Sequence, residues 1–591
     1  MSAVTSQIEQ ARWVTDPYYA IQISGWGFFP DGPAVAHFEA RVDDRVLATA
    51  PASPRPDVQQ HFAGTPAALH AGFLLKLPWV ALEAEVRIAA CRTGADPVVF
   101  HRFRAGDLPG RGPVITDYAA WSRRHDPEPA ARPASGGTRR LFSILLPVYR
   151  TPPPFLRDCL ASVQAQTHPH WELIVVDDGS TQAELTEALH SAARAEPRIH
   201  LHPRATNGGI ARATNDALAA AAGEYVVLLD HDDLLRPHAL AEFDHALQQA
   251  PLLDAVYSDE DKIDADGGLV TPILKPGFSP EFLLGVMYVG HALCVRTAVA
   301  RQAGGFDPAF DGIQDFEFLL RVTEITRRIG HLPRILYHWR QSPGSTALHG
   351  NIKGDMDAKQ AAAIRAHLTR CGRLEQVLAL GAHRVRLTAP TVPSATLVRV
   401  ASGMDPLAEL RRAAAREQTE LLLLLSAEPL AGSDDWVREL SAVAALPDTG
   451  CAAPVLLSIE QRVLASGCTL DAGRLVPLMR GFDPAGDGYN GSLPCTREVG
   501  AVSAHCVALR RSLVIDHPAE NWADFLTVLA GTGLFHRVSG TARIQLPLSW
   551  VGLTTLGHSP TGIRDPYYSD QFATARGDYS LAHPPASSDS F

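Results

Sequence analysis

The chain has 591 residues, too many for one hydrophobic core, so we expect three or four domains. Its hydrophobic content of 46% and charged content of 20% are ordinary for a soluble globular protein. The formal net charge of -11 argues against general binding of nucleic acid, which requires a positively charged face.

Three features bear on where the protein works. Apolar runs such as Leu421–Leu425 are far shorter than the roughly 18–20 residues that a membrane span needs. The first residues, MSAVTSQIEQARW, lack the basic-then-apolar pattern of a signal peptide. No two of the cysteines form a C-x-x-C pair, so the sequence shows no zinc spacing. We therefore expect a cytoplasmic protein with reduced cysteines.

Residues 1–104 are predicted to form a small, all-β, sandwich-like module. The stretch HFEARVDDRVLATA alternates apolar and polar residues around a turn at Asp43 and Asp44, which is typical of a β-hairpin. Its aromatic residues are interpreted as core, with a sugar-stacking surface as the alternative; they are Trp26, Phe28, Phe29 and Phe73. Residues 105–140 then predict a linker with a short helix around Tyr118, because HDPEPAARPASGGTRR cannot bury enough surface to fold alone.

Strands and helices alternate from Phe142 onward. Amphipathic or helical segments at Leu156–Gln166, Ala211–Ala222 and Pro237–Gln249 separate apolar β-type runs. This is the βαβ rhythm of a mostly parallel sheet, so residues 141–380 predict an α/β domain.

Two of the apolar runs end on acids. WELIVV leads into Asp177 and Asp178, and YVVLL leads into Asp230, Asp232 and Asp233. In an open α/β sheet, ligands collect at the carboxyl ends of the strands, so these acids should line one crevice. Asp230-His231-Asp232 offers oxygen ligands for Mg²⁺ or Mn²⁺, and such an ion would hold a phosphate-bearing substrate.

The order of the sequence blocks resembles the family 2 glycosyltransferases with the GT-A fold, over roughly residues 116–372. The blocks are FSILLPVYR, WELIVVDDGS, NGGIARATN, GEYVVLLDHDD, VYSDEDKID, KPGFSPEFLL, DGIQDFEFLLR and YHWRQSPGSTA. They look most like bacterial surface-polysaccharide enzymes, rhamnosyltransferase-like proteins among them. The resemblance implies inverting transfer from a nucleotide-diphospho-sugar to a growing glycan of an O-antigen, capsule or exopolysaccharide. Lipid-linked glycan acceptors are common in this family, so peripheral contact with the inner face of the cell membrane stays open.

The resemblance implies a nucleotide site at the first two strands. Pro147 and Tyr149 would form the floor under the base. Asp177 and Asp178 would contact the base or ribose, with Asp178 the preferred contact; the alternative is an acid that caps the next helix. The Asn207-Gly208-Gly209 loop would let backbone approach the ligand, or support it structurally.

Two further residues and one segment are expected near the donor. Asp259 follows the strand LDAVYS and would bind donor hydroxyls or the acceptor. Arg340 would place a fixed positive charge over the diphosphate, next to the segment SPGSTA (342–347), which would close over it.

The resemblance also implies the metal ligands. Asp230 would touch ribose or metal-bound water, and Asp232 would bind the cation that bridges the two phosphates. His338 matches a third ligand position, where imidazole suits Mn²⁺ better than Mg²⁺. The alternative for His338 is a hydrogen bond at the end of its strand.

Asp315 is expected to be the catalytic base. An inverting transfer needs a carboxylate opposite the leaving phosphate to accept the proton of the acceptor hydroxyl. In the family, the first acid of an x-D-x-[DE] block at a helix start does this, and QDFEF fits with Asp315 first and Glu317 as the alternative. The helix dipole is expected to keep Asp315 ionised.

Residues 381–555 are predicted to form a degenerate second glycosyltransferase-like α/β domain. Aligning TELLLLLSAEPLA with GEYVVLLDHDDLL places Ser426 at Asp230 and Glu428 at Asp232. Further on, HCVALRRSL matches HALCVRTAV. The first half, with the PVY and DDGS motifs, has no room, so we expect this copy to be catalytically silent. The alternative is chance similarity between two α/β domains.

The same alignment places Asp524 at the position of Asp315 and Ser549 at the position of His338. Residues 556–591 are predicted to form a flexible tail.

Two rival functions follow from the sequence. A non-catalytic carbohydrate-binding or scaffold protein would not need the acids at 230, 232 and 315. A nucleotidyltransferase would need a basic Gly-rich phosphate loop, which PVYRTPPP lacks.

Overall fold

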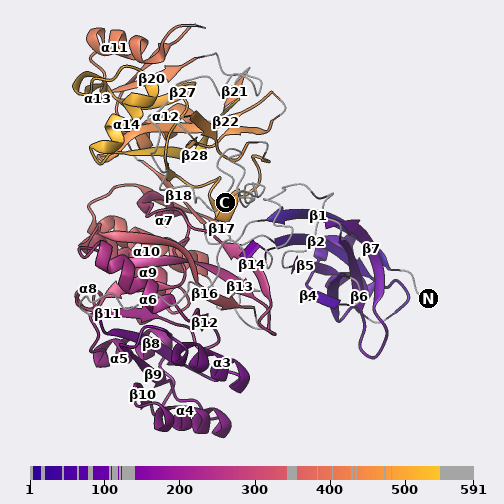
Figure 1. The fold of residues 1–591 in the computed structure, drawn as a ribbon. Coiled ribbons are helices and arrows are strands. Elements are labelled where there is room, and N and C mark those ends of the chain that lie inside the picture. The colour runs from indigo at the N-terminus through magenta and orange to yellow at the C-terminus, as the bar shows by residue number, and fades with distance from the viewer. Residues whose placement is uncertain are drawn as a thin grey trace, which may run out of the picture.

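The computed structural model describes residues 4–545 with gaps at 15–19, 33, 43–44, 63–64, 78–83, 106–107, 109–117, 119–120, 123–139, 342–355, 382–383, 390, 402, 427–429, 433–434, 460, 472–473 and 481. Most of the linker, the segment 342–347 and the tail 556–591 lie outside the described residues, so their predicted roles stay predictions. Residues 140–341 are continuous. No helix among the described residues is both long and apolar enough to span a bilayer. Figure 1 shows three groups of elements along the chain.

The first group consists of two antiparallel sheets. One has the order β1-β2-β5 and the other β4-β3-β6-β7. Phe38 and Ala40 of β3 point into a core shared by both sheets, while His37 and Glu39 alternate with them on the other face. The strands are β1 (Thr5–Val14), β2 (Ala20–Phe28), β3 (His37–Val42), β4 (Arg45–Pro51), β5 (Gly72–Leu77), β6 (Glu85–Cys91) and β7 (Val98–Arg104), with helices α1 (Pro56–His61) and η1 (Pro66–His70).

The aromatic residues of this group are mostly core. Phe28, Phe29 and Phe73 are buried, and Trp26 packs against Phe62 with ring centroids 5.5 Å apart. The interpretation as core therefore fits better than a sugar-stacking surface.

The second group is built on a nine-stranded sheet with the order β10-β9-β8-β11-β15-β13-β16-β12, and β14 pairs with β13. Strands β8, β9, β10, β11, β13 and β16 run in one direction. The prediction of an α/β fold with a mostly parallel sheet is confirmed. The strands are β8 (Phe142–Val148), β9 (Trp171–Asp177), β10 (Ile199–Pro203), β11 (Tyr225–Leu228), β12 (Leu234–Leu235), β13 (Ala255–Ile263), β14 (Leu269–Ile273), β15 (Leu293–Arg296) and β16 (Ile329–Arg340).

Helices cover both faces of this sheet. Ile144 and Leu146 of β8 face a core with Leu156 and Phe243, and Leu145 faces the opposite core with Ala213. The three predicted helices exist, and none of their ends is shifted by more than three residues. The helices are α3 (Pro153–Gln164), α4 (Ala183–Ala195), α5 (Ile210–Ala220), α6 (Ala239–Gln249), α7 (Pro280–Gly285), α8 (Thr297–Gln302), η3 (Pro308–Phe310), α9 (Gln314–Ile325) and α10 (Met356–Arg370).

The third group contains an eight-stranded sheet with the order β19-β20-β27-β22-β28-β21, in which β23 pairs with β22 and β26 with β28. Its strands are β19 (Ala395–Arg399), β20 (Leu421–Leu425), β21 (Ala431–Gly432), β22 (Thr449–Leu457), β23 (Val463–Ala465), β26 (Arg497–Val499), β27 (Cys506–Arg510) and β28 (Phe535–Gln545). The other elements are β17 (Gln376–Gly381), β18 (Arg384–Thr388), α11 (Pro406–Arg416), α12 (Trp436–Ala445), β24 (Cys468–Asp471), β25 (Arg474–Pro477), η4 (Tyr489–Gly491), α13 (Arg511–Asp516) and α14 (Trp522–Gly531).

This second α/β sheet repeats part of the first one. The order β19-β20-β27-β22-β28-β21 corresponds strand by strand to β8-β11-β15-β13-β16-β12. Leu421 pairs with Arg510 as Tyr225 pairs with Arg296, which places Ser426 in the position of Asp230, as aligned. Among the described residues this group has no counterparts of β9 and β10. The half that carries DDGS in the first sheet is therefore missing, although β19 fills the place of β8.

The register corrects one detail of the alignment. Ala431 of β21 pairs with Gln545, as Leu234 of β12 pairs with His338, so Gln545 stands in the position of His338. Ser549, which the alignment placed there, lies outside the described residues, as does Glu428. The register also places the buried apolar run 455–457 where β13 carries the acids 259–261.

The two α/β groups share buried contacts around β14 and α7. The backbone N–H of Leu274 donates to the hydroxyl of Tyr489 at 2.8 Å. The Ser279 hydroxyl donates to the buried carboxylate of Glu498, which also accepts from Arg537 at 2.9 Å. Figure 1 shows α7 and β18 where the two groups meet. The C-terminal group thus holds the chain segment that leads from β14 into α7.

Replacing Tyr489 with Phe tests this contact. The change keeps the ring but leaves the buried N–H of Leu274 without its acceptor, which costs about 1–3 kcal/mol. We expect a lower midpoint in chemical unfolding of the full chain. An unchanged unfolding curve would contradict a stabilising role for this bond.

Candidate active site

The polar residues singled out in the sequence gather at one edge of the nine-stranded sheet. Asp177 ends β9, Asp230 follows β11, and Asp315 lies in the first turn of α9. Since β9 and β11 are parallel to β8 between them, their carboxyl ends meet at the same edge. The acids that follow these strands therefore lie along one edge of the sheet.

The carboxylate of Asp178 holds the loop 207–209 by hydrogen bonds. Its carboxylate accepts hydrogen bonds from the backbone N–H groups of Gly208 and Gly209 and from the side-chain amide of Asn207, each at 2.9 Å. Arg204 adds an ion pair at 3.0 Å. Asp178 is 2% exposed, so it is a structural anchor in this conformation, and its preference as base contact is corrected. Asn207 also serves this loop.

Asp177 differs from Asp178 in its hydrogen bonds more than in its burial, because it is also only 5% exposed. One of its oxygens accepts a hydrogen bond from the N–H of Ser180 at 3.0 Å, which fixes the carboxylate at the strand end. Pro147 pairs with Val176 on the neighbouring strand and is buried, while Tyr149 is half-buried just beyond β8. These three residues form a polar and aromatic corner.

Gly209 sits where no side chain fits. Its φ is +94°, and a Cβ atom there would lie 2.1 Å from Oδ2 of Asp311. The carboxylate of Asp311 accepts from the N–H of Ala211 at 3.0 Å at the start of α5. Gly209 thus lets the loop turn into α5 and pass close to Asp311, so its demonstrable role is a structural one.

Three acids crowd together after β11. Burial and the charges of Asp232 and Asp230 raise the pKa of Asp233 well above its usual range. The Tyr337 hydroxyl donates to Asp233 at 2.6 Å, and the N–H of Arg340 donates to it at 2.8 Å. Asp233 is thereby a buried support, while the side chains of Asp230 and Asp232 keep 40% and 22% exposure at the edge. This concentration of negative charge favours a cation.

His338 lies beside these acids, because its residue on β16 pairs with Leu234. Its Nδ1 is 2.5 Å from the buried carboxylate of Asp261, which also accepts from the Tyr118 hydroxyl at 2.5 Å. A carboxylate at Nδ1 fixes the proton there and leaves Nε2 as a ligand atom. The donor set fits a divalent cation, although the ligand atoms of Asp230, Asp232 and His338 do not all lie within 4.8 Å of one another.

Asp315 faces the acids from α9. Burial and the charge of Asp230 raise its pKa, while His291 and the N–H groups at the helix start act in the opposite sense. Burial thus opposes the effect of the helix start on the carboxylate, and the net shift of its pKa is upward. Glu317 makes two hydrogen bonds to Arg321, at 2.7 and 2.6 Å, and is 3% exposed, so it is a poor alternative base.

Asp259 and Arg340, which were predicted to contact the donor, point into the protein interior. Asp259 is fully buried and accepts from the N–H of Lys275 at 2.7 Å and from His331 at 2.8 Å. Arg340 is 2% exposed and donates to the Asp232 carbonyl at 2.9 Å and to Asp158 at 3.1 Å. Both side chains are closed to a ligand here, so structural roles replace the predicted donor contacts.

His291 is the residue that the sequence did not single out as part of a site. Its Nε2 lies 3.8 Å from Asp230, its ring stacks on Tyr337, and its charge would act on Asp315. Because β15 runs against its neighbours, the residues just before that strand reach the acidic edge. A histidine just before an antiparallel strand gives no periodic signal, and only the known strand direction could have identified it.

Lys275 holds His291 in place. Its fully buried ammonium group donates to the carbonyls of Ser258, Val289 and His291 at 2.7, 2.6 and 2.5 Å. Glu260 lies 3.5 Å from the same ammonium group and accepts from the N–H of His291 at 2.7 Å. This cluster fixes the backbone on which His291 sits.

Comparisons with known proteins match this region. Residues 143–269 match the sequence model described as glycosyl transferase family 2. The O-antigen biosynthesis protein RfbC of Myxococcus xanthus is 38% identical over 299 residues, which are 49% of this chain and 23% of that protein. The uncharacterised protein y4gI of Sinorhizobium fredii is 26% identical over 534 residues, 75% of this chain and 59% of that protein.

This chain thus spans less than two thirds of either relative. Among solved structures, that of S. aureus TarS 1-349 in complex with UDP-GlcNAc has a TM-score of 0.31 and 20% identity, covering 39% of this chain and 73% of that one. The matched residues 143–269 contain β8 to β13 and the acids at their ends. Through residues 143–269, the chain is thus similar to the family 2 glycosyltransferases.

Proposed function

We propose that the chain transfers a sugar from a nucleotide-diphospho-sugar to a growing bacterial surface glycan, with inversion at the anomeric carbon. The observation that carries this proposal is the gathering of Asp177, Asp230, Asp232 and Asp315 at one sheet edge within a family 2 domain. Residues 141–380 would be the catalytic domain, flanked by domains at 1–104 and 381–555. A lipid-linked acceptor would bring the protein to the inner face of the cell membrane.

The donor would lie along the carboxyl ends of β8, β9 and β11. Asp177 would accept a hydrogen bond from the base or ribose, over the floor made by Pro147 and Tyr149. Asp178 would act indirectly, because it shapes the loop 207–209 beside that floor.

Asp232 and His338, with Asp230 close by, would hold Mg²⁺ or Mn²⁺. When bound, that ion would stabilise the negative charge of the departing nucleoside diphosphate. Asp261 would keep Nε2 of His338 available by holding the proton on Nδ1.

Asp315 would act as the base. The acceptor oxygen forms a bond to the anomeric carbon as the bond from that carbon to the diphosphate oxygen breaks, and the hydroxyl proton passes to Asp315. A raised pKa suits this role, because it makes the carboxylate a stronger proton acceptor. The nearby ring of His291 would balance the charge between Asp315 and Asp230.

The nature of the acceptor is supported by the relatives. RfbC is named for O-antigen biosynthesis, and a chondroitin synthase of Pasteurella multocida is 29% identical over 199 residues, 34% of this chain and 20% of that protein. A carbohydrate-binding role without catalysis suits the C-terminal sheet better than the whole chain, because Ser426 and the apolar run 455–457 replace acids there.

Replacing Asp232 with Ala tests the metal site. We expect the loss of Mn²⁺-dependent nucleoside diphosphate binding in titration calorimetry, with an unchanged thermal melt, because the side chain fills no core volume. Asp266→Ala, which removes an exposed acid on the β13–β14 turn, is the control and should bind normally. Unchanged affinity that resists EDTA would refute the metal assignment.

Replacing Asp315 with Asn tests the base. The nearly isosteric change should leave donor binding intact and lower turnover at least ~10²-fold. The matched control is Asp524→Asn, in the first turn of α14 in the C-terminal copy, which should keep full turnover. Turnover within a few-fold of wild type would exclude Asp315 as the base.

The pH profile gives an independent check on Asp315. Because the folded-state pKa is raised, the carboxylate becomes a competent base only above that pKa. The acid limb of kcat/KM should therefore lie above the pKa of an ordinary Asp, about 3.9. An acid limb at or below that value would contradict the assignment.

The pair Asp177→Asn and Asp178→Asn separates ligand contact from support. Asp178→Asn removes the charge that anchors three N–H donors and Arg204, so we expect about 2 kcal/mol lower stability in chemical unfolding. Asp177→Asn should weaken nucleotide binding with a smaller effect on unfolding. The reverse pattern would restore Asp178 as the base contact.

A further inference from the structure

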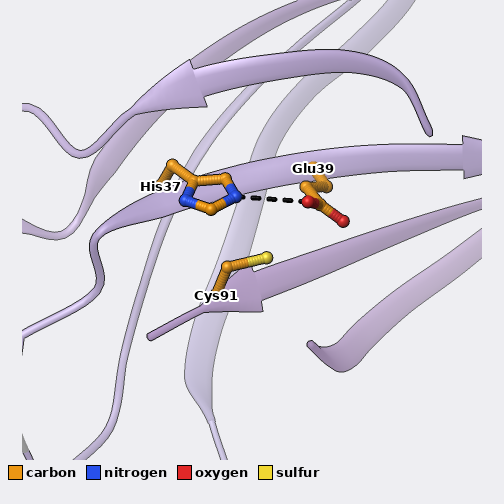
Figure 2. Close-up of side chains that lie close together, drawn as sticks. All are labelled: His37, Glu39 and Cys91. Atoms are coloured by element: carbon orange, nitrogen blue, oxygen red, sulfur yellow. Dashed lines mark hydrogen bonds and ion pairs between the residues drawn. The ribbon is translucent and has the colours of Figure 1, made fainter. Parts of the chain in front are cut away.

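Three metal-ligating side chains meet on the outer face of the N-terminal sheet, far along the chain from the acidic edge. His37 and Glu39 are two residues apart on β3 and therefore share one face. Cys91 ends β6 and pairs directly with His37 across the two antiparallel strands. Figure 2 shows the three side chains turned toward one another from these neighbouring strands.

Their spacing is close to that of a zinc site. One ligand atom from each residue lies within 4.8 Å of the others, and Nε2 of His37 is 3.2 Å from Oε1 of Glu39. Tetrahedral zinc with bonds of about 2.0–2.3 Å separates adjacent ligand atoms by about 3.3–3.8 Å. The backbone thus already places the three ligands, and small side-chain movements would close them around an ion.

The surroundings orient the ligands. Arg41 donates to Oε2 of Glu39 at 2.6 Å, so the other oxygen is the one directed at His37. Burial opposes ionisation of Glu39, but the hydrogen bonds from His37 and Arg41 outweigh it and lower its pKa. Arg41 can keep this position while Oε1 binds a metal, as partners beyond the first ligands commonly do.

The cysteine is buried and chemically suited to a metal. Cys91 is 3% exposed, and burial together with the charge of Glu39 raises its thiol pKa to about 11. A Zn²⁺ ion bound to this sulfur would take the place of the thiol proton. The side chain of His37 is 42% exposed, which leaves room for water as a fourth ligand.

We propose that His37, Glu39 and Cys91 form a Zn²⁺ site that ties β3 to β6 and is separate from the transferase site. Thiolate and imidazole ligands select Zn²⁺ over Mg²⁺ or Mn²⁺, which prefer oxygen. The spacing of residues in the sequence could not reveal this site, because Cys91 is not part of a C-x-x-C motif. Only the pairing of strands in the sheet brings Cys91 next to His37.

A second cluster, Glu324, His367 and Cys371, supplies the matched control. Its ligand atoms are equally close, but both oxygens of Glu324 accept from Arg370, at 2.8 and 3.0 Å, and Cys371 is exposed. The guanidinium group of Arg370 binds both oxygens of Glu324 and would therefore compete with a metal ion for this carboxylate. This cluster is therefore not expected to bind zinc tightly.

The test uses the full chain after chelation and dialysis. Co²⁺ is titrated as a zinc analogue while the near-ultraviolet thiolate-to-cobalt absorption is recorded, and Zn²⁺ is then added in competition. We expect a thiolate band in wild type and in Cys371→Ser, and none in Cys91→Ser. The band should persist in Asp232→Ala, which separates this site from the proposed transferase metal.

Calorimetry with Zn²⁺ gives the affinity. His37→Ala and Glu39→Gln should each weaken binding at least about 10-fold relative to Cys371→Ser. Zn²⁺ should raise the thermal melting midpoint of wild type and leave that of Cys91→Ser unchanged; should Cys91→Ser fail to fold, Glu39→Gln carries the comparison. No band in wild type, equal binding by Cys91→Ser, or loss of the band in Cys371→Ser would each overturn the site.

Discussion

The repulsion among carboxylates at the end of β11 is the constraint on which the rest of this structure depends. Asp230, Asp232 and Asp233 lie within four residues, and the charges of Asp230 and Asp232 help to raise the pKa of Asp233. Asp233 accepts two hydrogen bonds from Tyr337 and Arg340 of β16, whereas Asp230 and Asp232 lie at the open edge. This arrangement separates one buried acid, which is held by hydrogen bonds, from two acids whose side chains stay exposed at the sheet edge.

Buried acids also support other residues on the neighbouring strands. Asp178 holds the loop 207–209, Asp259 holds the backbone of Lys275, and Asp261 holds the ring of His338. These inner acids position the outer residues, among them His338 and the turn into α5. The site is therefore an outer row of exposed acids supported by an inner row of hydrogen-bonded ones.

The sequence predicts the α/β fold and the acidic edge well, because both rest on local patterns. Apolar runs of strand length that end on acids, such as WELIVVDD and YVVLLDHDD, specify strand ends without knowledge of the tertiary structure. Whether an acid faces the ligand or the interior is a different question. Asp259 and Arg340 were assigned outward but point inward, because strand pairing around β13 and β16 decides their direction. His291 depends on the reversed direction of β15, which no local pattern encodes.

Buried polar contacts also set how far this chain can be divided into parts. Leu274 and Ser279 of the first α/β sheet depend on Tyr489 and Glu498 of the second, and the intervening chain runs on to Lys275 and His291. A shortened protein ending near residue 380 would expose Leu274 and leave Ser279 without its acceptor. The region of this chain that matches the family 2 model is therefore not an independent unit: exchanging it between related proteins would require transferring the C-terminal sheet together with it.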